Sequence, residues 1–333
     1  MLEHHLTLDR RQFLKGVGLT TASLALPGAL SALAAETTTG VPRRKFGKTG
    51  ETVSIIGVGG HTLATAKDEA ESIRIVHEAI DQGVNFMDNA WEYHDGRSEV
   101  VMGKALAGGW REKAFLMTKV CTHGKGKNFA MNMLEESLKR LQTDHLDLWM
   151  IHQLDTQEQV TSAFAPGGAV EALDAARKQG KIRFGGFTGH ADPEVHLAML
   201  AHDYAWDAVL MPINSFEANR TGFRTRVLPV VAQRGIAGLG IKSLGGNGKV
   251  VKDGKFTAEQ CLRFSLSQPL TVQIVGVNSV EQLRTAVDIA RKFKPMTPAE
   301  MEKLTAHTAT LDNPARYCCY RQPGYGYGHV GRA

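Results

Sequence analysis

The sequence predicts an α/β protein that forms one (β/α)8 TIM barrel between residues 44 and 310. Eight short runs rich in β-branched and other apolar residues alternate with longer segments whose apolar residues recur three and four positions apart. No second linker and no change in composition divides this region, as a two-domain chain would require. Eight repeats of strand and helix in one unbroken region are typical of a closed parallel barrel.

The individual elements can be placed from these patterns. A short hairpin around Lys48, Thr49 and Gly50 comes first, and we expect it to close the floor of the barrel. The eight expected barrel strands lie at residues 54–58, 84–87, 114–118, 146–151, 182–187, 208–211, 236–241 and 272–275. The clearest helices between them lie at residues 68–82, 128–141, 169–179 and 280–292.

An open, doubly wound sheet is the alternative arrangement of such units. A dinucleotide-binding sheet of that kind carries G-x-G-x-x-G after its first strand and an acidic residue about 20 positions later. Residues 57–62 read Gly-Val-Gly-Gly-His-Thr and do not match this motif. The closed barrel is therefore the better interpretation.

The first 34 residues have the layout of an export signal. An Arg-Arg pair at residues 10–11 precedes an uncharged apolar run at residues 16–35, and residues 32–34 read Ala-Leu-Ala, as at a cleavage site. The pattern resembles the twin-arginine signal, with Asp9 in place of its usual Ser or Thr. The resemblance implies that the export machinery carries the folded protein to the periplasm.

We expect residues 1–34 to be removed on export and residues 35–43 to form a linker. The apolar run contains glycine and proline, so it is a poor candidate for a stable membrane span. An N-terminal amphipathic helix packed on the domain is the alternative, but the run has no polar face.

Composition argues against two other classes of function. The formal charge of +5 is modest for 333 residues, and no long basic run interleaved with aromatic residues predicts nucleic-acid binding. The four cysteines lack the paired C-x-x-C spacing of a zinc or iron-sulfur site, so we expect no metal; they are Cys121, Cys261, Cys318 and Cys319.

Four polar residues stand at the C-terminal ends of successive expected strands, where barrel active sites are built. Asp88 ends the second strand and Tyr93 follows in its loop, while Lys119 and His152 end the third and fourth strands. Because these positions are equivalent in consecutive units, we expect the fold to bring the four side chains together.

The motifs around these residues resemble those of the aldo-keto reductase family. Three segments in the same order and spacing carry the resemblance: Asp-Asn-Ala-Trp-Glu-Tyr at 88–93 followed by Arg-Ser-Glu at 97–99, Met-Thr-Lys-Val at 117–120, and Leu-Asp-Leu-Trp-Met-Ile-His at 146–152. The resemblance extends from about residue 44 to about residue 291.

The resemblance implies an enzyme that reduces an aldehyde or ketone to an alcohol with a nicotinamide cofactor, which supplies the hydride. Tyr93 is then the general acid. A free tyrosine, with a pKa of about 10, donates poorly at neutral pH, so the cation of Lys119 is needed to stabilise the tyrosinate. Asp88 would hold Lys119 charged and in place, and His152 would orient the carbonyl oxygen.

The resemblance also implies a cofactor site at the ends of the last four strands, although several expected side chains are replaced. Gly189 and Met211 stand where the family usually has asparagine and glutamine, and Ile241 stands where an aromatic ring often stacks on the nicotinamide. The expected cofactor residues are Gly59, Thr188, Asn214, Lys242, Ser243, Leu244, Gly245, Gly276, Asn278, Ser279 and Gln282.

Cofactor preference stays open at this point. Family members that require a 2′-phosphate often carry Lys or Arg after the eighth strand, where this chain has Gly276 and Gln282, with Arg284 as the nearest cation. We favour NADP(H) on family habit, with NAD(H) as the alternative. Asn278 or Ser279 would cap the following helix, whose backbone N–H groups would bind an adenosine phosphate.

The expected walls of the substrate pocket are His61, Trp91, His123 and Gln153. The Tyr- and Gly-rich C-terminal tail at residues 311–333, which contains the Cys318-Cys319 pair, either covers the barrel mouth or is disordered. Two further functions are compatible with these residues: a nucleotide-binding regulatory subunit with little turnover, and a sugar or alcohol dehydrogenase that works in the oxidative direction.

Overall fold

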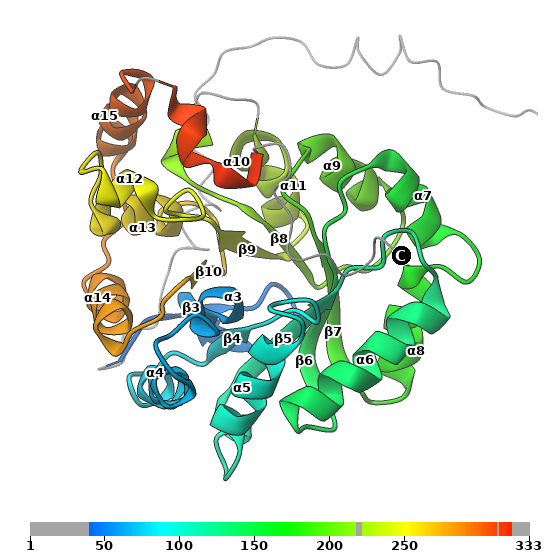
Figure 1. Ribbon diagram of the computed structural model, residues 1–333. Helices are drawn as coiled ribbons and strands as arrows, with labels where there is room; N and C mark the ends of the chain where they lie inside the picture. The colour runs from blue at the N-terminus through cyan, green and yellow to red at the C-terminus, as the bar shows by residue number, and fades with distance from the viewer. Residues whose placement is uncertain (1–39, 218–221, 312, 322–333) are drawn as a thin grey trace, which may run out of the picture.

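Eight parallel strands close into a barrel in the order β10-β3-β4-β5-β6-β7-β8-β9, ringed by helices (Figure 1). The computed structural model describes residues 40–217, 222–311 and 313–321. The barrel strands are β3 (Ile56–Gly59), β4 (Phe86–Asp88), β5 (Phe115–Val120), β6 (Leu146–Ile151), β7 (Ile182–Thr188), β8 (Ala208–Pro212), β9 (Ala237–Ile241) and β10 (Val272–Val275). This confirms the (β/α)8 prediction.

Helices follow the strands and cover the outside of the barrel. They are α3 (Gly60–Leu63), α4 (Glu69–Asp81), α5 (Arg97–Leu106), α6 (Lys127–Leu141), α7 (Gln157–Phe164), α8 (Ala169–Lys178), α9 (Pro193–Ala201), α10 (Phe223–Arg226), α11 (Leu228–Gln233), α12 (Lys249–Lys252), α13 (Ala258–Leu266), α14 (Val280–Arg291) and α15 (Pro298–Ala309). Short 3-10 turns are η1 (Arg111–Lys113), η2 (Ser215–Glu217), η3 (Pro314–Tyr317) and η4 (Cys319–Arg321). The four helices predicted from periodicity correspond to α4, α6, α8 and α14.

Local side-chain chemistry fixes where several helices begin. Asp68 accepts a hydrogen bond from the backbone N–H of Glu71 at 2.6 Å and starts α4. Helices α7, α13 and α15 start with capping boxes, in which a threonine and the residue three positions later satisfy each other's backbone N–H groups. These caps fix the residues at which the preceding loops end.

The predicted hairpin is present and closes the barrel floor. Strands β1 (Arg43–Lys45) and β2 (Thr52–Ser54) pair antiparallel. Phe46, between them, is fully buried, and its ring lies 4.7 Å from that of Phe115 and 5.8 Å from that of Phe184. Apolar side chains therefore fill the barrel interior from this end, and the barrel is not an open channel.

Part of the C-terminal tail is folded against the barrel. Tyr317, Cys318 and Tyr320 are buried in an apolar cluster with Phe216 and Phe256. The alternative that the tail is disordered therefore does not hold for residues 313–321.

The predicted export signal at residues 1–34 lies outside the described residues. Within the described ranges, no helix is long and apolar enough to cross a membrane.

Candidate active site

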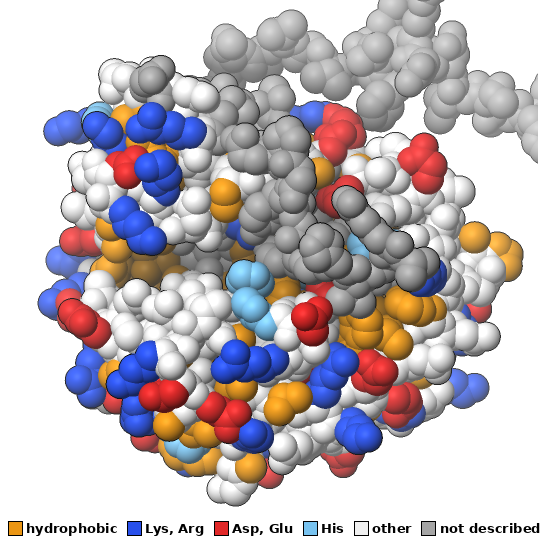
Figure 2. All heavy atoms as spheres, in the orientation of Figure 1, with side chains coloured by type: hydrophobic (Ala, Val, Ile, Leu, Met, Phe, Trp, Pro, Cys, Tyr) orange, Lys and Arg blue, Asp and Glu red, His pale blue; other side chains and the backbone are white. Residues whose placement is uncertain are grey.

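A cavity of about 640 Å³ opens at the C-terminal ends of the barrel strands. All four predicted catalytic residues line it: Asp88, Tyr93, Lys119 and His152. In Figure 2, the face of the molecule is hollowed beside histidine side chains near its centre. The cavity continues from these four residues, the catalytic tetrad, to β10 and α14, so it is long enough for an extended ligand.

Lys119 is the centre of the charge arrangement. Its side chain extends from β5 into the barrel mouth and is only 1% exposed. The ammonium lies 2.5 Å from Oδ1 of Asp88 and donates hydrogen bonds to the backbone oxygen of Asn89 at 2.5 Å and to the phenolic oxygen of Tyr93 at 3.3 Å. Three acceptors therefore match its three N–H donors, which stabilises a charge that burial alone would disfavour.

Tyr93 is placed by the loop after β4. The side chain is 5% exposed, and the Lys119 ammonium lies 4.7 Å from its ring centroid. The rings of His61 and His152 meet the phenol edge-on, with centroid distances of 5.2 and 5.8 Å. A phenolic oxygen held beside a buried cation is stabilised when it loses its proton.

His152 is fixed from behind by a residue that the sequence analysis did not select. Its Nδ1 forms a close hydrogen bond with Oε1 of Glu92, and its backbone N–H donates to the backbone oxygen of Val120 at 2.8 Å. The thiol of Cys121 lies beneath, where it donates to Oε1 of Gln153 at 2.9 Å. An acidic residue directly before the candidate acid, Tyr93, was the signal in the sequence.

Burial and mutual contact shift the pKa values of Glu92, His152 and Cys121. Burial raises the pKa of Glu92, but the charge of His152 and its hydrogen bond outweigh burial and leave that pKa below its ordinary value. Burial lowers the pKa of His152, and Glu92 offsets this only in part. Burial also holds the pKa of the Cys121 thiol well above its ordinary value, so this cysteine stays protonated.

Seven of the eleven residues expected at the cofactor line the cavity: Gly59, Lys242, Ser243, Leu244, Gly276, Asn278 and Gln282. Lys242 has a positive φ of 63°, and burial lowers its pKa to about 8. Lys252, which was not predicted, also lines the cavity.

The other four lie beside the cavity. Thr188 is fully buried at the end of β7, and Ser279 caps α14 by accepting from the N–H of Gln282 at 3.2 Å. Asn214 donates from its Nδ2 to the hydroxyl of Tyr320 at 2.8 Å, so the C-terminal tail already uses this amide.

Gly245 is similarly covered by the tail. It has a φ of 76°, and its backbone oxygen accepts from the N–H of Cys319 at 3.3 Å. A side chain at this position would overlap the backbone oxygen of Tyr317.

The end of β8 requires a correction. Met211 was expected where the family's glutamine faces the cofactor, but Leu210 lines the cavity and Met211 packs in the apolar layer between strands and helices. Successive side chains of a strand point to opposite faces, so the error is one residue of register.

Only one of the four residues expected in the substrate pocket lies on the cavity wall. His61 lines the cavity, whereas Trp91, His123 and Gln153 do not. The indole N–H of Trp91 donates to Glu136 of α6 at 2.8 Å, and the side chain of His123 is exposed.

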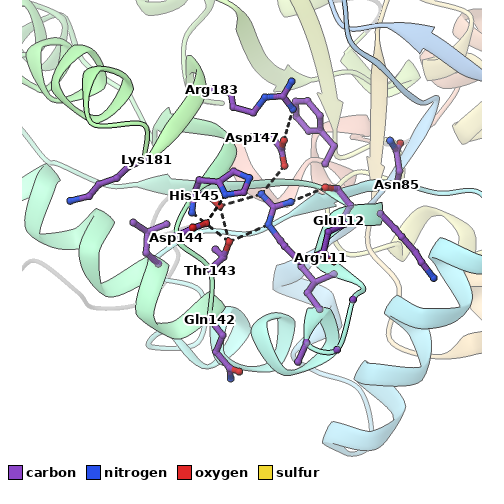
Figure 3. Close-up of a pocket in the computed structure, with 18 of the residues that line it drawn as sticks. Asn85, Arg111, Glu112, Gln142, Thr143, Asp144, His145, Asp147, Lys181 and Arg183 are labelled. Carbon is purple, nitrogen blue, oxygen red and sulfur yellow. Dashed lines mark hydrogen bonds and ion pairs between the residues drawn. The ribbon is translucent and has the colours of Figure 1, made fainter.

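A second cavity, of about 1210 Å³, lies at the opposite end of the barrel (Figure 3). Asp147 is paired there with Arg111 at 3.0 Å and with Arg183 at 2.7 Å. Because these charged groups satisfy each other next to the barrel floor, they have a structural role there.

Comparison with known proteins places the fold and site in a family. The model of the aldo/keto reductase family matches residues 55–257, which include the whole tetrad. The chain belongs to the aldo/keto reductase family. It is therefore an oxidoreductase.

Individual members show how far this likeness extends. The methylglyoxal reductase YeaE of Escherichia coli is 37% identical over 134 residues, which are 39% of this chain and 44% of that protein. The L-galactose dehydrogenase of Arabidopsis thaliana is 32% identical over 164 residues, which are 45% of this chain and 49% of that protein. The chain thus spans about half the length of these two relatives.

A solved aldo/keto reductase from Klebsiella pneumoniae, in complex with NADP and acetate, shares the fold. The two structures superpose with a TM-score of 0.62 and 22% identity, over 84% of this chain and 95% of the other.

Proposed function

We propose that this aldo/keto reductase interconverts a carbonyl compound and its alcohol by hydride transfer, with Tyr93 as the group that exchanges a proton with the reacting oxygen. The single observation that carries the proposal is the phenolic oxygen of Tyr93, which accepts from the buried Lys119 ammonium at the mouth of a long cavity. When bound, the nicotinamide cofactor supplies or accepts the hydride.

Each residue of the tetrad has a separate task in this proposal. Tyr93 donates its proton to the oxygen of an aldehyde or ketone, and Lys119 stabilises the tyrosinate that remains. Asp88 keeps Lys119 charged by its contact at 2.5 Å. His152, on the same cavity wall, positions the substrate oxygen.

The residues present fit a nicotinamide dinucleotide, but the adenosine end of the cavity offers little charge for a 2′-phosphate. Arg284 is already paired with Glu78 at 2.6 Å, and the N–H of Val280, the first residue of α14, donates to Glu71 at 3.0 Å. Among the described residues that line the cavity, Lys252 is the lysine that belongs neither to the four predicted catalytic residues nor to the residues expected at the cofactor. We therefore propose NAD(H) as a cofactor alongside the NADP(H) expected from family habit.

Absorbance loss of NADH and NADPH, measured for the full chain with a panel of aldehydes, ketones and sugars, tests this function. We expect carbonyl-dependent oxidation of a cofactor that falls by at least about 10²-fold in Tyr93→Phe. Cofactor binding without turnover on any carbonyl or alcohol would instead support the regulatory-subunit alternative. A Lys252→Gln variant that weakens NADPH binding but not NADH binding would identify the 2′-phosphate contact.

Export remains a separate proposal. We propose that residues 1–34 direct the folded enzyme to the periplasm, because a paired arginine and an uncharged apolar run precede an Ala-Leu-Ala segment. Replacing Arg10 and Arg11 by lysine should leave the protein in the cytoplasm, as measured by cell fractionation. Unchanged fractionation would contradict the proposal.

A further inference from the structure

A buried carboxylate lies behind the tetrad and has no task in the proposed reaction. Glu92 is 3% exposed and directly precedes Tyr93, and its Oε1 is in close contact with Nδ1 of His152. Both side chains are buried, so water does not compete for this contact. Burying a carboxylate costs free energy unless a hydrogen-bonded partner compensates for the lost water, and His152 is that partner here.

A metal ion is the first alternative to consider, because ligand atoms of Glu92, Cys121 and His152 lie within 4.8 Å of one another. Zinc holds nitrogen and oxygen ligands at about 2.0–2.2 Å in a tetrahedron, which keeps the two ligand atoms roughly 3 Å or more apart. The direct contact between Glu92 and His152 leaves no room for an ion between them. A hydrogen-bonded pair accounts for this geometry.

The pair determines which nitrogen of His152 carries a proton. A carboxylate only accepts hydrogen bonds, so Nδ1 of the imidazole must be the donor to Glu92. In a neutral imidazole the other nitrogen, Nε2, is then an acceptor. The Nε2 edge of the ring points away from Glu92, and His152 and Tyr93 line the same cavity with ring centroids 5.8 Å apart.

The charges around the pair favour an ionised Glu92 beside a neutral His152 at neutral pH. Burial lowers the pKa of His152 and the Lys119 ammonium lowers it further, against the opposite effects of Glu92 and Asp88. Cys121, which also faces the pair, stays protonated because burial raises its pKa. The ring of Tyr93 also faces the imidazole.

We infer that Glu92 is a positioning residue that makes His152 a proton acceptor, so that at neutral pH the site takes the hydroxyl proton of an alcohol substrate through Tyr93. The inference rests on the proposed function and names its substrate class as alcohols, whose hydroxyl proton the site is prepared to accept at neutral pH. It differs from the expectation that His152 donates a hydrogen bond to a carbonyl.

Alcohol oxidation at this site moves two protons and one hydride. The alcohol O–H bond breaks as its proton moves to the oxygen of Tyr93, while the phenolic proton of Tyr93 moves to Nε2 of His152. The electron pair of the adjacent C–H bond leaves as hydride to the oxidised nicotinamide cofactor, and a carbonyl forms. The imidazolium beside Glu92 then loses one proton to solvent. Carbonyl reduction is the reverse and requires the pair to be protonated, as at lower pH.

Nitrogen-15 NMR of the full chain without cofactor, labelled at histidine, tests the pair directly. His152→Gln assigns the signals. At pH 7 we expect a neutral His152 protonated on Nδ1 alone. In Glu92→Gln the neutral amide can either accept from Nδ1 or donate to it, so protonation of Nδ1 is no longer enforced and the two nitrogen shifts should move toward each other. Cys121→Ala, the matched control, should keep the wild-type pattern.

Kinetics provide the second readout. On an alcohol that the wild type oxidises, we expect kcat/KM to fall as the pH drops through the pKa of the pair, and Glu92→Gln to lower kcat by about 10²-fold with little change in KM. Cys121→Ala should change kcat less than threefold, because Cys121 does not line the cavity.

Three results would overturn the inference: a wild-type His152 protonated on Nε2 or on both nitrogens at pH 7, a Glu92→Gln variant with the wild-type pH profile and rate, or stoichiometric zinc in the purified protein. Turnover together with an Nε2-protonated His152 would leave the proposed function intact and reject only the role of Glu92. Absence of turnover on every alcohol and carbonyl would reject the proposed function, while the NMR spectra still decide the role of Glu92.

Discussion

Replacing Asp88 by asparagine isolates the contribution of the buried ion pair to stability. The substitution keeps the shape of the side chain but removes the charge 2.5 Å from the Lys119 ammonium, which is 1% exposed. The two remaining acceptors, the backbone oxygen of Asn89 and the hydroxyl of Tyr93, carry no formal charge. Lys119 is then a buried cation without a counter-charge.

Breaking a buried pair by removing one partner costs about 3–5 kcal/mol of the free energy of unfolding. We therefore expect Asp88→Asn to lose at least about 3 kcal/mol, measured by urea denaturation at pH 7 with tryptophan fluorescence. Hydride-transfer activity should fall as well, because Asp88 no longer holds the Lys119 ammonium in place beside the phenolic oxygen of Tyr93. The double variant Asp88→Asn/Lys119→Met should recover most of the stability but none of the activity.

An exposed pair on the same protein supplies the matched control. Lys104 and Glu69 lie 2.9 Å apart with side chains 45% and 43% exposed, so Glu69→Gln should cost less than about 1 kcal/mol. A loss below about 1 kcal/mol in Asp88→Asn as well would refute the reasoning, because burial would then make no difference to the value of the counter-charge.

Three further predictions concern other parts of the molecule. Burial raises the pKa of Glu99 to about 7 from its ordinary 4.5. The free energy of unfolding should therefore be highest below pH 4.5 and fall by about 3 kcal/mol as the pH rises to about 7. Glu99→Gln should remove this pH dependence, as measured by denaturation curves at several pH values. Gly245→Ala should lower Tm more than Gly248→Ala, since both have positive φ but only the first meets the C-terminal segment; equal shifts would contradict the tail packing. Leu210→Gln should tighten cofactor binding about 2- to 10-fold in fluorescence titration by adding an amide to the cavity, whereas Met211→Gln should only destabilise the protein.

The fold could be predicted because its signals are local and repeated. Each barrel strand is a short apolar run between helical segments, and the predicted strands at residues 146–151 and 272–275 coincide with β6 and β10. The tetrad followed from the same regularity, since parallel strands bring residues at equivalent positions to one end of the barrel. The structure places Asp88, Lys119 and His152 at one cavity.

The remaining parts of the site depend on register and on long-range packing, which composition and spacing do not encode. One residue of register decides whether Leu210 or Met211 faces the cavity. Asn214 is bonded to Tyr320, a residue 106 positions away, and a pairing of this length leaves no local pattern. Glu92 was overlooked because its partner, His152, lies 60 positions away.

Two buried pairs, Asp88–Lys119 and Glu92–His152, flank Tyr93. They have separate tasks in the exchange of protons at this site. Asp88 and Lys119 form an ion pair that holds the ammonium 3.3 Å from the phenolic oxygen. Glu92 and His152 gain or lose one proton, because burial disfavours the imidazolium while the carboxylate favours it. The first pair therefore stabilises the tyrosinate, and the second pair determines whether His152 can accept a proton from Tyr93 or donate one to it. On this reasoning the pH at which kcat/KM for alcohol oxidation falls is set mainly by Glu92 and His152. Because the charge of Asp88 also raises the pKa of His152, removing that charge should lower the rates in both directions and move this pH slightly downward.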